Sequence, residues 1–150
     1  KAHAHTQSSK FNASKFKPGD LIMVEDAGFF IDKYGGFPGP YIKDFLARMT
    51  LTQICDAYAG SNTQAAAAIA CCYIGDPNHM IVHEERVPGL ITEHPKGDMG
   101  FGFDPIFMCT QHPDNLTLAQ MMPEVKNEYS ATTICAKKIL DALRFEPISY

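Results

Sequence analysis

Residues 21–31 read LIMVEDAGFFI, a short apolar run, two acids and a second apolar run. The turn residues Pro18-Gly19-Asp20 bound the first run, which predicts a buried strand from Leu21 to Val24. Glu25 and Asp26 are then expected at the C-terminal end of this strand. Because ligands bind at the carboxyl ends of strands in open α/β sheets, the acidic pair is a candidate functional site.

The segment after this stretch is predicted to be a loop and a helix. Residues 34–40, YGGFPGP, combine flexible glycines with restrictive prolines, which predicts a loop. From Tyr41 to Ala59, apolar residues mostly recur at steps of three and four, which predicts a helix. Gly60-Ser61-Asn62 ends it.

The middle of the chain is predicted to add strands. Residues 64–74, QAAAAIACCYI, fit a helix because alanine favours helices, but also a buried strand before Gly75-Asp76-Pro77. We expect a strand over 66–74, an interpretation that the family resemblance described below also favours. Residues 80–93 alternate loosely, which predicts two short strands broken at Pro88-Gly89.

The C-terminal third contains a glycine-rich aromatic segment, residues 97–107, and two predicted helices. The first covers residues 116–122, with Thr117 as N-cap. The second covers residues 129–144, with Ser130 as N-cap. Because strands and helices interleave, the predicted class is α/β, with all 150 residues in one domain.

Composition and charge indicate a globular protein that does not bind nucleic acid broadly. The chain is 45% hydrophobic and 20% charged, and its net charge is −4. This acidic balance argues against the basic face that broad nucleic-acid binding requires. A few converging lysines can still bind a small anion. No window approaches the ~20 apolar residues of a membrane span, so no membrane association is expected.

The ends of the chain and its cysteines indicate a cytoplasmic location. The polar start, KAHAHTQSSK, resembles no signal peptide and lacks an initiator Met, so we expect the domain to be truncated at its N-terminus. Residues 1–9 are expected to be the end of a helix. The five cysteines have no C-x-x-C spacing, which indicates reduced thiols in a cytosolic protein.

The acidic pair Glu25-Asp26 is the first candidate for chemistry. Neighbours on a strand point to opposite faces, so at most one of the two carboxylates faces a given pocket. Such a carboxylate can hold Mg²⁺ beside a phosphate, or position an attacking water. The alternative is a solvated turn after a strand.

Two further segments are candidates for binding. In the first, glycines flank Phe101, whose ring can stack on a base, and Asp104 can accept hydrogen bonds from a base edge. The alternative is a turn packed in the core through its phenylalanines. In the second, Lys126 beside Asn127 offers a charge suited to phosphate, although a solvated surface lysine is the alternative.

In this order, the segments resemble the inosine triphosphate pyrophosphatases, the Ham family. The resemblance runs from about Val24 to Leu143, and four blocks carry it: VEDAGFFID, GGFPGPYIKDFL, GFGFDPIF and EVKNEYS. It implies an elongated α/β fold with a mixed central sheet, flanking helices and two lobes around a cleft. It also implies a homodimer that hydrolyses the triphosphates ITP, dITP and XTP to monophosphate and pyrophosphate with Mg²⁺.

The resemblance also implies roles for individual residues. Asp26 matches the residue that binds Mg²⁺ and activates water, with Ala27 contacting substrate and Glu25 as a supporting metal ligand. Lys43 matches a lysine that faces the phosphates, and Lys1 loosely matches another substrate lysine. Lys126 matches a lysine near the base and sugar. The segment that encloses the base is matched by Phe101, Gly102, Phe103 and Asp104.

The chain departs from the family pattern at several positions. The first strand and its phosphate loop, of the form S/T-x-N-x-x-K, are not matched. After Ser130 the family has His-Arg, where this chain has Ala131-Thr132, and Gln64 and Gln120 replace a basic and an acidic residue. Two hypotheses follow, an active pyrophosphatase or a non-catalytic relative that binds nucleotides or partners. A Maf-type pyrophosphatase fits the aromatic block less well.

Overall fold

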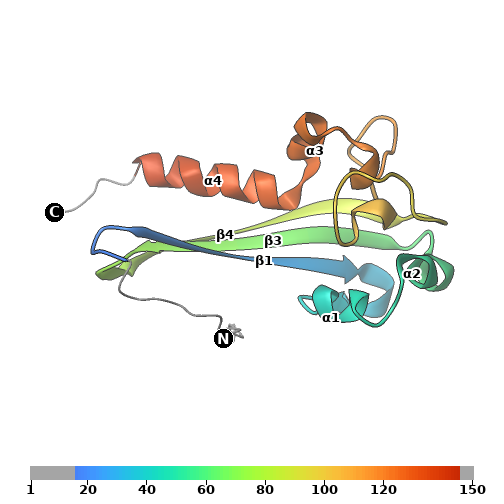
Figure 1. Cartoon of the computed structure of the whole chain (residues 1–150), viewed down its shortest axis with the longest axis horizontal. Helices are drawn as coiled ribbons and strands as arrows, with labels where there is room; N and C mark the ends of the chain where they lie inside the picture. Colours follow the sequence, from blue (N-terminus) through green and yellow to red (C-terminus); the bar gives the residue numbers. More distant parts are fainter. Residues whose placement is uncertain (1–15, 146–150) are drawn as a thin grey trace.

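One sheet runs the length of the structure (Figure 1). The computed structural model describes residues 16–145. Within them the sheet has five strands in the order β2-β1-β3-β4-β5. The strands are β1 (Leu21–Ile31), β2 (Pro38–Gly39), β3 (Asn62–Tyr73), β4 (Asp76–Ile91) and β5 (Phe107–Cys109). The α-helices are α1 (Ile42–Leu46), α2 (Leu51–Tyr58), α3 (Pro123–Tyr129) and α4 (Ala131–Phe145), and the 3-10 helices are η2 (Asp32–Tyr34), η3 (Asp104–Ile106) and η4 (Leu118–Gln120).

The predicted combination of helices with one central sheet is confirmed, but the sheet is not mixed. Every strand pair among the described residues is antiparallel. Figure 1 shows α4 along one side of the long strands, with α1 and α2 near the end at which β1 finishes. The predicted helix over residues 1–9 lies outside the described residues.

The strand β1 is longer than predicted and continues to Ile31. Phe29 and Ile31 are fully buried, so the apolar stretch after the acids remains in the sheet. Glu25 and Asp26 therefore lie in the middle of the strand, and the prediction that they end it was wrong. Acids commonly mark turns, but an exposed strand also tolerates them because they stay in water.

The register of β1 fixes which side chains share a face. Residues 21–31 pair with residues 73–63 of β3 without a shift, so alternation is unbroken. Glu25 and Phe29 lie on the face that α4 covers, where Glu25 accepts a hydrogen bond from Thr132 and the ring of Phe29 contacts Phe103. Asp26 lies on the opposite face.

The helix predicted over 41–59 is two helices, α1 and α2. The second restarts at Thr50, whose hydroxyl accepts the Gln53 N–H at 3.2 Å while the Gln53 side chain accepts the Thr50 N–H at 2.9 Å. This capping box satisfies amide groups that a helix start leaves unpaired. The apolar spacing continued across the break, so periodicity alone did not reveal it.

The alanine-rich segment is the strand β3, as predicted, but β4 is not broken at Pro88-Gly89. Pro88 lacks an N–H, yet its carbonyl accepts hydrogen bonds from both the amide and the hydroxyl of Thr110. Gly89 lets Phe107 pack against the backbone, because a Cβ there would lie 2.4 Å from that ring. The two turn-forming residues serve packing within one strand.

The predicted C-terminal helices are present in shorter pieces. Residues 118–120 form the 3-10 helix η4, and Thr117 caps it as predicted. The predicted helix over 129–144 begins only at Ala131, after the separate helix α3. Ser130 lies between the two and accepts the Thr133 N–H at 3.5 Å, which is the bond expected of the predicted cap.

Candidate functional site

The acidic pair lies on a free edge of the sheet. β2 pairs with β1 only at Phe29 and Phe30, so no other described strand pairs with residues 21–28 on that side. Both Glu25 and Asp26 are exposed there. The arrangement keeps two neighbouring carboxylates in water while it directs one to each face of the sheet.

Asp26 lines a groove of about 310 Å³ on the face of the sheet away from α4. The floor consists of small residues, because alanines of β3 lie beside Gly28 of β1. The lining residues are Asp26, Ala27, Gly28, Phe30, Pro40, Ala66, Ala67, Ala68, Glu84 and Arg86. The small side chains leave the space of this groove empty, and charged side chains lie at its border.

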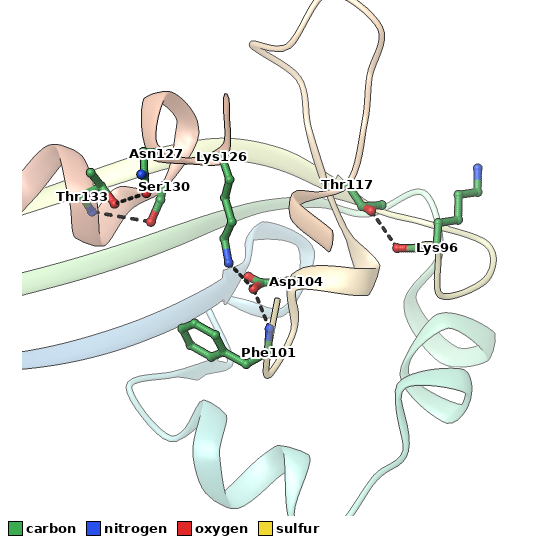
Figure 2. Close-up of polar contacts among 8 residues, drawn as sticks. All are labelled: Lys96, Phe101, Asp104, Thr117, Lys126, Asn127, Ser130 and Thr133. Carbon is green, nitrogen blue, oxygen red and sulfur yellow. Dashed lines mark hydrogen bonds and ion pairs between the residues drawn. The ribbon is translucent and has the colours of Figure 1, made fainter. Parts of the chain in front are cut away.

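The aromatic segment forms a loop held by a buried ion pair (Figure 2). Asp104 accepts the Phe101 N–H at 2.8 Å and the Lys126 ammonium at 2.5 Å through the same oxygen. The side chains of Asp104 and Lys126 are only 7% and 17% exposed. Gly100 has φ +120°, and a Cβ there would lie 2.4 Å from Asp104, so only glycine fits this turn.

The two aromatic rings of this loop have different environments. Phe103 packs on Phe29 and Phe107, with ring centroids 4.6 and 6.2 Å away, as the core-packing alternative predicts. Phe101 is 82% exposed, and its only described ring contact is the Lys126 ammonium, 4.8 Å from its centroid. The loop therefore anchors one ring in the core and presents the other to solvent.

The Lys126-Asn127 segment joins this loop to the junction of α3 and α4. The side chain of Asn127 accepts the Thr133 hydroxyl at 3.3 Å (Figure 2). At the other end of the aromatic segment, the Thr117 hydroxyl donates to the Lys96 carbonyl at 2.8 Å. Lys126 itself is mostly buried and paired with Asp104, so the lysine is not simply solvated.

Lys43 is exposed on α1, next to the same loop. A Cβ on Gly102 would lie 3.8 Å from Leu46 of this helix, so α1 and the aromatic loop are in contact distance. Lys1 lies outside the described residues.

The structure brings the predicted residues together only in part. Phe101, Gly102, Phe103, Asp104 and Lys126 form one unit, which packs through Phe103 on Phe29. Neither this unit nor Lys43 lines the groove at Asp26. Glu25 and Asp26 do not share a pocket, and among the described residues no group of three or more His, Cys, Asp or Glu could hold a metal.

The sequence interpretation missed Phe30, Pro40, Glu84 and Arg86, which line the groove. Glu84 and Arg86 are two residues apart in a strand, so they share a face, and that alternation was the available signal. Their place in the groove depends on the register between β4 and β3, which the sequence alone does not give.

No cysteine forms a disulfide within the described residues. Burial raises the pKa of the Cys55 and Cys135 thiols above their ordinary range. Both thiols therefore remain protonated at neutral pH. Between residues 16 and 145, none of the helices has the length and apolar character that a membrane crossing requires.

The curated proteins that are similar to this chain include nucleoside triphosphate pyrophosphatases. An inosine triphosphate pyrophosphatase of Trypanosoma cruzi is 36% identical over 113 residues, which are 73% of this chain and 56% of the relative. A dITP/XTP pyrophosphatase of Pyrobaculum aerophilum is 35% identical over 129 residues, covering 83% and 64% of the two chains. The chain thus spans less than two thirds of the length of these curated relatives.

Solved structures show the same fold. A HAM1 protein from Coxiella burnetii matches with a TM-score of 0.69 at 22% identity, over 85% of this chain and 68% of the other. A dITP/XTP pyrophosphatase from Mycobacterium abscessus matches with a TM-score of 0.59 at 25% identity, over 80% and 66%. The sequence profile of the Ham1 family matches residues 2–142. The chain therefore belongs to the Ham1 family.

Proposed function

We propose that the chain is a nucleoside triphosphate pyrophosphatase that hydrolyses ITP, dITP or XTP to the monophosphate and pyrophosphate, as a cytoplasmic homodimer. The observation that carries this proposal is the loop at Gly100–Asp104. An exposed ring on a loop fixed by a buried ion pair is suited to stacking on a base, because the ring is ordered before the ligand arrives.

Asp26 is the proposed catalytic group and metal ligand. Mg²⁺ is commonly bound by one or two carboxylates together with substrate phosphates and water, and an exposed carboxylate bordering a groove fits that mode. The bound ion would neutralise charge on the phosphate oxygens. Asp26 itself would orient the attacking water towards phosphorus.

Glu25 receives a different role in this proposal. It lies on the opposite face and accepts a hydrogen bond from Thr132 at 3.2 Å, so it supports the junction with α4 rather than sharing a metal with Asp26. Lys43 on α1 and Ala27 beside Asp26 are the proposed contacts to the phosphate chain.

The proposed base site is the aromatic loop. Phe101 supplies the stacking surface, Gly102 and Phe103 supply backbone groups, and Lys126 lies behind the ring. Because Asp104 already accepts two hydrogen bonds through one oxygen, its proposed task is to hold the loop. Backbone donors aimed at a 6-keto group would go unpaired against adenine, which selects for hypoxanthine and xanthine.

A non-catalytic nucleotide-binding module is the second candidate. It is favoured by the separation of the Asp26 groove from the aromatic loop, since an enzyme must hold base and phosphates at once. Ala131 and Thr132, in the positions where the family has His-Arg, also remove two charged contacts to substrate.

Hydrolysis of ITP separates the two candidates. The assay measures pyrophosphate released from ITP and ATP by the full chain with Mg²⁺. We expect turnover of ITP over ATP, and a loss of at least about 100-fold in Asp26→Asn, because a positioned carboxylate contributes that much to water attack. Asp56→Asn, an exposed carboxylate on α2, is the matched control. Turnover that persists in Asp26→Asn would exclude this mechanism, and no turnover of any nucleotide would favour the binding module.

A further inference from the structure

Arg86 is the one cationic side chain among the described residues that line the Asp26 groove. It extends from β4, whose register places it opposite Ala66 of β3, and Ala66 in turn lies opposite Gly28 of β1. The backbones of β4 and β1 are about 10 Å apart, two strand spacings. Because Ala66 and Gly28 have almost no side chain, the long side chain of Arg86 can lie across the groove.

The guanidinium of Arg86 rests on a fixed aromatic surface. Its carbon lies 4.2 Å from the centroid of the Phe30 ring. That ring is packed closely by glycines, since a Cβ would lie 2.5 Å from the ring at Gly28 and 3.3 Å at both Gly36 and Gly39. The missing side chains of the glycines leave space for the ring, and the ring packs against the guanidinium.

The hydrogen bonds of Arg86 fix its orientation without using all of its donors. Nε donates to Glu84 at 2.6 Å, and Nη1 makes a long contact of 3.4 Å with the side-chain amide oxygen of Gln64. No partner of Nη2 is found within residues 16–145. The side chain is 44% exposed, so water or a ligand reaches it.

We propose that Arg86 binds the phosphate chain of the nucleotide in the Asp26 groove, an inference that rests on the proposed function. A planar guanidinium matches the geometry of a phosphate and can form two parallel hydrogen bonds to it. Stacking on Phe30 and the bond to Glu84 fix the side chain in advance, so little rotamer entropy is lost when an anion binds.

The charges of the groove favour an anion that brings a cation with it. The other charged residues in the lining are Asp26 and Glu84. Their two negative charges exceed the one positive charge of Arg86, so the groove is net negative. A Mg²⁺ ion bound with the polyphosphate would offset part of the negative charge on the phosphates and on Asp26. The guanidinium of Arg86 would supply hydrogen bonds to phosphate oxygens beside this ion.

Calorimetric titration of the full chain with sodium tripolyphosphate and Mg²⁺ tests the inference. We expect Arg86→Gln to weaken binding about 10- to 100-fold, the loss of a charge-assisted phosphate contact. Arg86→Lys should recover part of the affinity, because it restores the charge without the planar fork. Arg144→Gln removes the same charge from the exposed end of α4 and should change affinity less than about twofold, because solvent and salt screen it.

The outcomes distinguish this inference from the proposed function. Tripolyphosphate binding that is unchanged in Arg86→Gln, or absent from the unsubstituted protein, would overturn the role of Arg86. ITP turnover in the unsubstituted protein would then still support the pyrophosphatase. If Arg86→Gln loses tripolyphosphate binding but the unsubstituted protein hydrolyses no nucleotide, the anion site stands and the enzymatic function fails. Matching melting temperatures of the three variants exclude unfolding as the cause.

Discussion

At the scale of single residues, the ion pair of Asp104 and Lys126 fixes the conformation of the aromatic loop. Both side chains are mostly buried, and the same Asp104 oxygen bonds the backbone of Phe101. A buried pair contributes little net stability over apolar residues, but removing one partner leaves the other charge without compensation. We therefore expect its main effect to be on loop conformation.

A double-substitution cycle measures this pair. Lys126→Met should lower the free energy of unfolding by about 2–4 kcal/mol, because the Asp104 charge stays buried. Asp104→Asn keeps an acceptor for Phe101, and in this background Lys126→Met should cost less. The expected coupling is about 0.5–3 kcal/mol, from urea unfolding of the four proteins. Additive costs would show that the two side chains do not interact in solution.

The role of a residue could be predicted from the sequence where a short motif sets the local backbone conformation. The glycines around Phe101 indicated a tight turn, and Gly100 does need its positive φ. The bond of Asp104 to Lys126 joins positions 22 residues apart, so no local pattern revealed it. For the same reason the groove residues Phe30 and Arg86, on different strands, were missed.

At the scale of elements, the strand β1 explains how one short sequence serves both faces of the sheet. Glu25 meets α4 and Asp26 meets the open groove, because strand neighbours alternate. Periodicity predicted most strands and helices, since burial follows the helical or strand repeat. It misplaced their ends, because the capping box at Thr50 and the packing of Phe107 on Gly89 override the pattern.

The start of α2 offers a test of this local control. Thr50→Ala removes the hydroxyl that accepts the Gln53 N–H and should lower the free energy of unfolding by about 1 kcal/mol. Thr52→Ala, at an exposed position inside the same helix, should leave stability unchanged or slightly higher, because alanine favours helix interiors. Thermal unfolding compares them. Equal losses in both variants would show that the cap does not define this helix.

At the scale of the whole molecule, the free edge of β1 separates the two parts of the proposed site. The aromatic loop packs through Phe103 on one face, and the groove with Asp26 and Arg86 lies on the other. Two neighbouring residues near the end of β1 contact the two parts, because Phe29 packs on Phe103 of the aromatic loop while Phe30 lines the groove. A nucleotide whose base contacts Phe101 would pass its phosphates over this edge into the groove.

A crystal structure of the full chain with Mg²⁺ and a non-hydrolysable ITP analogue tests this arrangement most directly. We predict phosphate oxygens within hydrogen-bonding distance of the Arg86 guanidinium, a metal ion on the Asp26 carboxylate and the base against the Phe101 ring. Phosphates bound on the Glu25 face beneath α4, with Asp26 and Arg86 touching neither metal nor phosphate, would contradict it.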